Sequence, residues 1–382
     1  MKDGRLRELL LTAPLPDDLQ ARRRSWSVVR AAFEEREPVR RRPNLRPALA
    51  LAVVAALVAA AVSSPGGAVI ERVREAIGIE RAQPALFSLP APGRVLVSST
   101  RGVWVVQPDG SKRLLGRYRE SSWSPSGLFV VVARGNELVA LDPRGSLRWT
   151  LARRAVGLPR WAGSAGDTRV AYFSGRELRV VAGDSDPDWR VAKEARRVPP
   201  AWRPGRAHVL AYVTSGGRIV ARDVDARRTL WRTRSVEASR RLLWSDDGAR
   251  LVAVKRRGLS VYRRDGRLLR GQPVPGVLGA AALAPGTHRL AVVRRLGDES
   301  EVLLFDVDRP GRRPQPLFSG TGVLTDLAWS PDGRWLLIGW QTADQWVFSR
   351  VTGPRRIEAV SNVSAQFRSS RFPTIAGWCC AP

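Results

Sequence analysis

From about residue 90 onward, the hydrophobic positions fall into short runs that Gly, Asp and Pro interrupt at regular intervals. The runs are rich in Val, Leu, Tyr and Trp, as in LFVVVAR from Leu128 and RLVAVKR from Arg250. Runs of this length and composition, separated by turn residues, predict β-strands. Helical periodicity is lost over the same region, so the pattern indicates an all-β fold for most of the chain.

The runs belong to a repeat whose clearest copy is WSPDGRWLLIG, which starts at Trp329. An aromatic residue, a turn and an apolar strand recur in that order, and successive copies are 38, 41, 42, 39 and 46 residues apart. The copies start at Trp123, Trp161, Trp202, Trp244, Leu283 and Trp329. A unit of about 40 residues with four short strands is typical of a β-propeller blade, because stacked sheets bury one another's faces around an axis.

Most residues that stand out in the repeat have a structural explanation. Glycine allows the positive φ of a tight turn, and we expect the tryptophan to pack between neighbouring blades. The residues assigned to these blade turns are Trp123, Gly127, Trp161, Trp202, Gly205, Trp244, Gly248, Trp329, Asp332, Gly333 and Trp378.

The two ends of the repeat region predict how the ring closes. TIAGWCC, from Thr374, resembles the strand before a blade turn, but the unit breaks off at Pro382. Residues 93–116 resemble the later strands of a blade that lacks its first strand. We therefore expect TIAGWCC to pair with RVLVSS (Arg94–Ser99) in one shared blade, which makes seven blades in all.

The repeat also resembles known families. LAWSPDGRWLLIG, from Leu327, resembles the repeat of TolB-like, WD-repeat-like bacterial propellers. LVALDPRGSLRW and IVARDVDARRTLW are similar to repeats of quinoprotein-like propellers, including BamB-type assembly factors. The resemblance covers about residues 90–382, although the copy at Leu283 lacks the Trp and the copy at Trp161 lacks the Pro. Such repeats specify a fold and leave the function open.

The N-terminal part of the chain has a different pattern. Residues 47–62 read PALALAVVAALVAAAV, and the uncharged stretch continues to Ile70, 24 residues in all. About 20 apolar residues suffice to cross a bilayer as a helix. Residues 1–46 carry 12 Lys and Arg, so the positive-inside rule predicts a cytoplasmic N-terminus and an external propeller. A cleaved secretory signal is the alternative, but a leading segment of 46 residues is far longer than usual.

These patterns divide the chain into four segments. We expect a cytoplasmic helical tail at 1–46, a transmembrane helix at 47–64, a stalk at 65–90 and an extracytoplasmic β-propeller at 91–382. Within the tail, residues 16–37 place apolar side chains close to one helical face, which fits a partner helix or a membrane surface. The tail lacks the His and Cys of zinc-binding anti-sigma domains but shares their layout of a small cytoplasmic piece, one span and an external domain.

The formal charge of +29 comes from 64 basic and 35 acidic residues, and only four of the basic residues are lysine. This skew, together with abundant Ala, Gly and Pro, is typical of a GC-rich genome, so the charge is weak evidence for nucleic-acid binding. No basic run is interleaved with aromatic residues as single-stranded nucleic acid requires. A basic surface can still attract an acidic envelope polymer or anionic lipid.

Candidate chemistry is sparse. His208 and His288 follow blade turns at matching positions, so we expect them in different blades, as strand-entry residues rather than ligands. Asp142, Asp306 and Asp308 stand at the ends of strands, where turn chemistry explains them. The sequence contains no P-loop, Gly-x-Ser-x-Gly, His-x-x-x-His or dinucleotide fingerprint. We therefore predict no catalytic, cofactor-binding or metal-binding residues.

Cys379 and Cys380 are adjacent and are the only cysteines. A disulfide ring between neighbours is strained, so they could instead bond another chain or stay reduced. We favour small buried side chains flanking Trp378. Quinoprotein alcohol dehydrogenases carry a vicinal disulfide beside their cofactor, but here the pair lies in the last four residues of a much shorter chain.

The sequence thus predicts a membrane-anchored propeller that acts as a non-catalytic binding or scaffold protein for a protein or an envelope polymer. The tail could in addition bind a cytoplasmic regulator. One alternative is an anti-sigma-like signalling protein with the propeller as sensor. The other is a quinoprotein-like or hydrolytic propeller enzyme.

Overall fold

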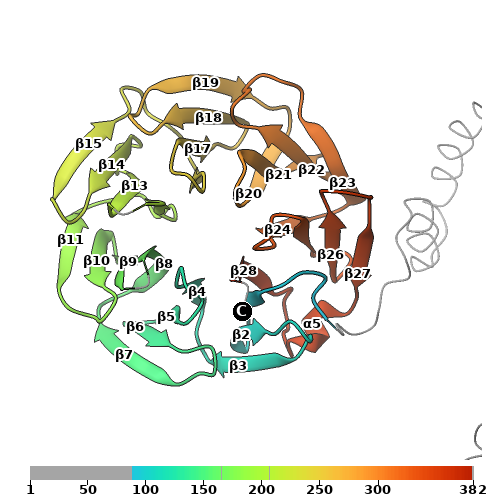
Figure 1. The fold of residues 1–382 in the computed structure, drawn as a ribbon, viewed down its shortest axis with the longest axis horizontal. Helices are drawn as coiled ribbons and strands as arrows, with labels where there is room; N and C mark the ends of the chain where they lie inside the picture. Colours follow the sequence, from blue (N-terminus) through green and yellow to red (C-terminus); the bar gives the residue numbers. More distant parts are fainter. Residues whose placement is uncertain (1–87, 165, 206, 381–382) are drawn as a thin grey trace, which may run out of the picture. The chain divides into compact units, whose positions relative to one another are not determined.

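The computed structural model describes residues 88–380, except 165 and 206, and this region forms a ring of seven four-stranded antiparallel sheets (Figure 1). Each sheet is one blade, with its first strand nearest the central axis and its fourth at the rim. The all-β propeller with seven blades is therefore confirmed. The predicted tail, membrane helix and most of the stalk lie outside the described residues. Within the described part, no helix has the length and hydropathy needed to span a bilayer.

The first four blades, from the axis outward, are as follows. Blade 1 contains β28 (Thr374–Cys379), β1 (Arg94–Ser99), β2 (Gly102–Val106) and β3 (Lys112–Gly116). Blade 2 contains β4 (Glu120–Trp123), β5 (Val130–Arg134), β6 (Glu137–Leu141) and β7 (Leu147–Ala152). Blade 3 contains β8 (Val156–Ser164), β9 (Asp167–Ser174), β10 (Glu177–Ala182) and β11 (Asp188–Ala192). Blade 4 contains β12 (Ala201–Arg203), β13 (Val209–Val213), β14 (Ile219–Asp223) and β15 (Arg228–Arg232).

The remaining three blades continue in the same order. Blade 5 contains β16 (Arg241–Trp244), β17 (Arg250–Val254), β18 (Gly258–Arg263) and β19 (Leu268–Pro273). Blade 6 contains β20 (Val277–Leu283), β21 (Arg289–Leu296), β22 (Glu299–Asp306) and β23 (Gln315–Thr321). Blade 7 contains β24 (Leu324–Trp329), β25 (Trp335–Trp340), β26 (Gln345–Arg350) and β27 (Ile357–Val360). The one-turn helix α5 (Val363–Gln366) lies between β27 and β28.

The hydrophobic core is divided among the junctions between blades. Successive residues of a strand point to opposite faces of its sheet, and both faces are covered here, so the middle strands contain runs of consecutive buried apolar residues. In β5, Val130 and Val132 pack toward blade 1, whereas Val131 packs toward blade 3. Clusters of the same kind fill each of the other junctions around the ring. This is why the chain shows continuous apolar runs rather than a simple alternation.

The repeated Ser-x-Asp-Gly turn connects the first strand of a blade to the second. In blade 7, the hydroxyl of Ser330 accepts the backbone N–H of Trp335 at 2.9 Å and donates to Asp332 at 2.5 Å. Gly333 follows with a φ of 66°. Ser245 and Asp247 repeat both hydroxyl bonds in blade 5, at 2.9 and 2.6 Å. We call the side of the ring that carries these turns the turn face; it includes residues 124–129, 245–249 and 330–334.

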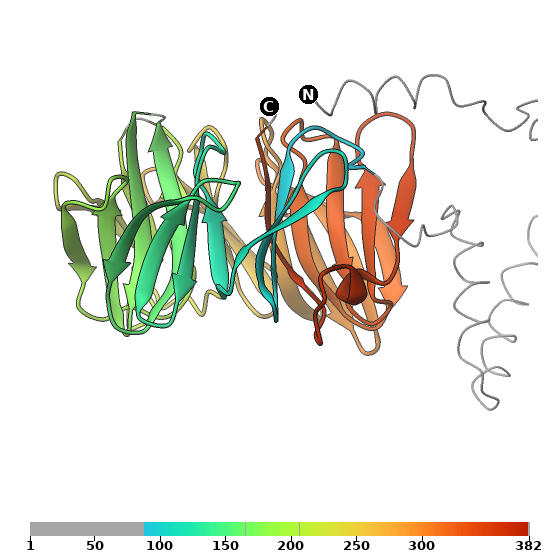
Figure 2. The ribbon, with the colours of Figure 1, turned by 90° about the horizontal axis from the view of Figure 1, so that it is seen from below.

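The ring closes in blade 1 with strands from both ends of the described region. β28 pairs antiparallel with β1, with Trp378 opposite Val95 and Thr374 opposite Ser98. The side view in Figure 2 shows the dark red closing strand beside the blue-green strands of blade 1. The predicted pairing of TIAGWCC with RVLVSS is therefore confirmed, and the propeller has no open edge at this position.

Candidate functional site

The most developed polar site lies on the turn face between blades 5 and 6, around His288. The His288 Nδ1 atom is 2.5 Å from the Asp308 carboxylate, which follows β22 of the same blade. The Nε2 atom is 3.0 Å from Asp247, in the blade 5 turn. Arg250, at the start of β17, lies 3.0 Å from the other Asp308 oxygen. The histidine thus links two blades through two carboxylates.

The charges in this His288 cluster support one another. Burial alone would lower the pKa of His288, but hydrogen bonds to Asp247 and Asp308 outweigh it, and the pKa is raised. Burial alone would likewise raise the pKa of Asp247, but bonds from Ser245, the Ala249 N–H and His288 hold it well below its usual range. Both ring nitrogens of His288 face carboxylates, so the doubly protonated ring satisfies both. Neither nitrogen is then free to act as a general base.

Two adjacent clefts open around this cluster. The larger one, of about 480 Å³, is lined by Thr287, His288, Arg289, Leu304, Phe305, Asp306, Asp308, Arg312, Arg313 and Gln315. The smaller one, of about 420 Å³, is lined by Asp246, Asp247, Gly286, Thr287, His288 and Asp308. The two share Thr287, His288 and Asp308, so they form one continuous polar surface across the junction. Their size is that of a binding site for a small group or for a segment of a larger ligand.

His208 makes the equivalent link between blades 3 and 4. Its Nδ1 atom lies 2.5 Å from Asp225 and its Nε2 atom lies 3.2 Å from the backbone carbonyl of Asp167. Arg169, which matches Arg250, lies 3.1 Å from Asp225. The two histidines lie in different blades as the sequence predicted, and each ties its blade to the preceding one. The sequence analysis explained Asp308 by turn chemistry alone and missed that it belongs to the His288 cluster. Asp142 accepts the N–H groups of Arg144 and Ser146 within its turn and lies 3.5 Å from the Arg148 guanidinium.

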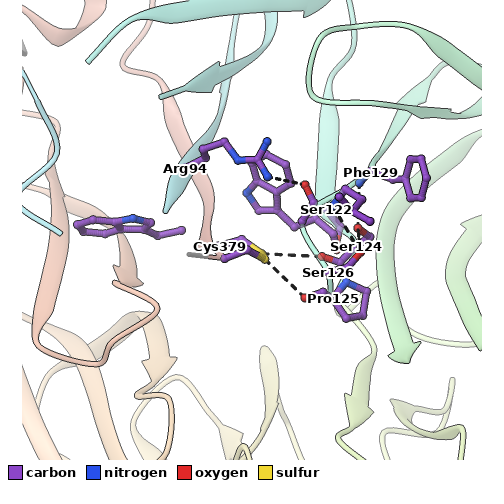
Figure 3. The surroundings of a disulfide bond; sticks show 12 residues. Arg94, Ser122, Ser124, Pro125, Ser126, Phe129 and Cys379 are labelled. Atoms are coloured by element: carbon purple, nitrogen blue, oxygen red, sulfur yellow. Dashed lines mark hydrogen bonds between the residues drawn. A yellow bond between two sulfur atoms is a disulfide. The ribbon is translucent and has the colours of Figure 1, made fainter. Parts of the chain in front are cut away.

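The cysteine pair lies on the turn face at the closing blade (Figure 3). Cys379 and Cys380 are bonded to each other and half-buried, whereas we expected small buried side chains. Their sulfur atoms lie 3.8 and 3.5 Å from the carbonyl oxygens of Ser124 and Pro125 in the blade 2 turn. A Cβ added to Gly127 would come within 2.7 Å of Cys380, so only glycine fits there. Arg94 donates to the Gly127 carbonyl at 2.7 Å. The cysteine pair and Arg94 thus both contact the blade 2 turn, which holds the closing blade against blade 2.

The residues predicted for the blade turns occupy the ends of the first strands and the turns that follow. Trp202 donates its Nε1–H to the Arg160 carbonyl at 2.9 Å, and Trp329 donates to the Ala282 carbonyl at 3.0 Å, so both link a blade to the preceding one. The indole rings of Trp123, Trp161 and Trp244 are also buried between blades. Trp378 instead bonds the Pro92 carbonyl at 3.1 Å. The four glycines predicted for the blade turns all have a positive φ: Gly127, Gly205, Gly248 and Gly333.

In the part of the chain that the structure describes, no group of three or more His, Cys, Asp and Glu side chains could hold a metal ion. In the His288 cluster, the imidazole lies between the two carboxylates instead of converging with them on a common point. The cluster therefore acts as an interblade link bordering a cleft.

Two solved structures similar to this chain are both putative 6-phosphogluconolactonases. A putative 6-phosphogluconolactonase from Bacteroides uniformis ATCC 8492 is 16% identical, with a TM-score of 0.52, and the match covers 71% of this chain and 98% of that one. A putative 6-phosphogluconolactonase from Bacteroides fragilis NCTC 9343 is 15% identical, with a TM-score of 0.50, over 76% of this chain and 98% of that one. Identities this low show the fold alone.

No protein-family model matches the chain, and the search of curated proteins gives no match. The class that fold and site define is thus a seven-bladed β-propeller with a polar, histidine-linked cleft on its turn face.

Proposed function

We propose that this chain is a membrane-anchored, extracytoplasmic propeller that binds a protein or an envelope polymer through its turn face, without catalysing a reaction on it. The observation that carries the proposal is the pair of adjoining polar clefts that share His288 and Asp308. The cluster beneath them holds two blades together, so the clefts have a fixed shape before a ligand arrives. A preformed surface loses little entropy on binding.

Unpaired positive charge indicates the chemistry of the ligand. Arg312 and Arg313 line the larger cleft and are exposed. Among the described residues, neither guanidinium group forms an ion pair with a carboxylate. Arginine in this state is suited to bidentate contacts with carboxylates. We therefore infer that the ligand presents acidic groups to this cleft.

The anchor rests on the apolar run at 47–64 and the 12 basic residues that precede it. We also assign the propeller to the TolB-like, WD-repeat-like type, on the strength of the Trp329 repeat. Leu89 donates to the Pro108 carbonyl, and Pro92 accepts from Trp378, so the chain enters the propeller on the turn face. The anchor is part of the proposal, so the test uses the full chain.

A photo-crosslinking amino acid placed at Thr287 of the full-length chain, in intact cells, tests the proposal. We expect an adduct that stays with alkali-washed membranes, as a discrete band for a protein ligand or a smear for a polymer. The double variant Arg312→Ala/Arg313→Ala should lose most of it. Arg256→Ala/Arg257→Ala, a matched pair of exposed arginines in the β17–β18 turn on the opposite face, should keep it. An adduct that both double variants retain equally, or one found only in the soluble fraction, would contradict the proposal.

A further inference from the structure

The face opposite the turn face carries a strongly basic surface across blades 3, 4 and 5, which follow one another around the ring (Figure 1). Four loops form this surface, and we call them together the basic sector: residues 193–197, 214–218, 233–240 and 255–257. They hold nine Lys and Arg but only two Glu. On the turn face of blades 4 and 5, residues 223–228, 245–250 and 263–267 hold six Arg and five Asp. An arginine-rich composition does not explain this contrast, because it is the acidic residues that differ between the two faces.

Contacts between the loops make the basic sector one continuous surface. The Arg196 N–H donates to the Val213 carbonyl at 2.9 Å, which joins the first loop to the second. The Glu237 N–H donates to the Gly217 carbonyl at 2.7 Å, and the Glu237 carboxylate lies 2.6 Å from the Lys255 ammonium group. These two contacts join the third loop to the second and to the fourth. The charges of three blades are therefore held side by side.

Both carboxylates of the basic sector are already engaged. Glu237 is only 5% exposed and is paired with Lys255. Glu194 forms an ion pair with Arg176, at 3.3 Å. Neither carboxylate is left to balance the other basic side chains of the four loops.

Seven basic side chains of the sector remain exposed: Lys193, Arg196, Arg218, Arg234, Arg240, Arg256 and Arg257. Within the described part of the chain, none of these side chains forms an ion pair or a hydrogen bond. The loops themselves are anchored, because the buried Thr233 hydroxyl accepts the Ile219 N–H at 3.0 Å and the buried Glu237 follows four residues later. Arg234 lies between these two anchors and is exposed. The arginines thus project from a fixed backbone without a partner of opposite charge.

We propose that the basic sector binds a linear polyanion, a polymer that carries phosphate or carboxylate groups at repeated intervals. Arginine forms bidentate, charge-assisted hydrogen bonds with either group. The loops come from three successive blades, so an extended chain can contact several arginines at once, whereas a small anion reaches only one or two. A surface of one sign of charge also attracts such a polymer from a distance.

The hydrophobic content of the sector favours a polymer over a lipid surface. In these four loops, all of which the structure describes, Val236 is the one strongly exposed large hydrophobic residue, at 63%. Surfaces that lie on a bilayer combine basic residues with several Trp, Phe or Leu side chains, which enter the acyl region. The basic sector offers charge almost alone, as a polyanion requires.

The chain supplies a matched pair of variants. The sector variant carries Arg196→Gln, Arg218→Gln, Arg234→Gln and Arg240→Gln. The control variant carries Arg227→Gln, Arg228→Gln, Arg264→Gln and Arg267→Gln, on the turn face of blades 4 and 5. All eight arginines are exposed and lack an ion pair among the described residues, so both variants should fold and melt as the unaltered chain does. Both lose the same net charge, so only the position of the loss differs.

The test uses the full-length chain purified in non-ionic detergent, with fluorescently labelled inorganic polyphosphate and polygalacturonate as probes. Fluorescence anisotropy should show binding that weakens as KCl is raised, because salt screens exposed charges. The sector variant should bind at least about tenfold more weakly, since each of four exposed ion pairs contributes a factor of about 1.5 to 5. The control variant should bind within about twofold of the unaltered chain. Preference for one probe distinguishes phosphate from carboxylate groups on the polymer.

Four results would overturn the proposal. The first is an unaltered chain that binds neither polymer, and the second is an equal loss in both variants, which would mean that only net charge matters. The third is competition by tripolyphosphate as strong as that by the long polymer at equal phosphate concentration, which would indicate a site for one small anion. The fourth is binding of mixed micelles with phosphatidylglycerol, but of neither polymer, which would indicate a lipid surface. If the sector variant fails to fold, the competition on the unaltered chain decides. The crosslink at Thr287 reports on the turn face alone, so this proposal and the proposed function can fail independently.

Discussion

The blade 3–4 and blade 5–6 junctions carry the same network at the same register but expose it differently. In each, a histidine and an arginine from neighbouring blades meet on one aspartate: His208 and Arg169 on Asp225, His288 and Arg250 on Asp308. The His208 side chain is only 4% exposed, whereas that of His288 is 21% exposed and borders two clefts. The same interblade contact is therefore buried at one junction and lines a cleft at the other.

The second partner of each histidine explains part of the difference. The Nε2 atom of His208 faces a backbone carbonyl, that of Asp167, whereas His288 faces the Asp247 carboxylate. Asp247 is available because the Ser-x-Asp-Gly turn of blade 5 holds it through Ser245. Blade 3 has a longer hairpin after Trp161 and no such turn. We infer that His208 is purely structural and that His288 also controls the charge of a site.

The largest expected effect tests whether these polar links or the closing strand hold the ring together. Removing residues 374–382 deletes β28 and with it the buried side chains of Ile375 and Trp378. Loss of two such side chains alone costs about 5 kcal/mol or more, and blade 1 would also lose its pairing partner. We expect the deletion variant to lose its cooperative thermal unfolding transition, which differential scanning calorimetry measures. Removal of residues 1–64 is the control and should leave the transition in place; an unchanged melting temperature after the C-terminal deletion would mean that β28 is dispensable.

A smaller effect separates the two histidines. His208→Ala should lower the free energy of unfolding by about 2–3 kcal/mol, because it removes a buried ring together with its contacts to the Asp225 carboxylate and the Asp167 backbone carbonyl. His288→Ala should cost about 1 kcal/mol, since water can replace the ring in the open cleft. Urea unfolding at pH 7 measures both. Equal losses, or a larger loss at His288, would remove the distinction between a structural junction and a site.

The blade architecture could be predicted from the sequence because its determinants are local. A Trp, a turn with Ser, Asp and Gly, and an apolar strand specify one blade, and their spacing specified seven, including the pairing of Arg94–Ser99 with the C-terminal strand.

The His288 cluster could not be predicted because its members meet across blades. Asp247 lies 41 residues before His288, and Asp308 lies 20 after it. Turn chemistry explained Asp308 adequately when it was considered alone, and nothing in the sequence singled out Asp247. A recurring His-to-Asp spacing, 17 residues in blade 4 and 20 in blade 6, was the one available signal. The sequence left the bonded state of Cys379 and Cys380 open, and the structure shows them bonded to each other beside the blade 2 turn.

The smallest expected effect is a pH dependence confined to the blade 5–6 junction. A histidine whose pKa is raised on folding contributes stability that is complete below its unfolded value, about 6.5, and is lost as the pH rises through the folded value. The lowered pKa of Asp247 adds stability that is present above about 3.9 and is lost in acid. The stabilising effect of His288 should thus be largest between these limits and decline in mildly alkaline solution.

The melting temperatures of the unaltered chain and of His288→Gln, measured from pH 5 to 9, should differ most near pH 6 and converge toward pH 9. Asp247→Asn should reduce the difference near pH 6, because it removes one of the two carboxylates that hold the proton on the ring. A gap that stays constant over the whole range would show that His288 links the blades as a neutral ring, as a purely structural histidine could.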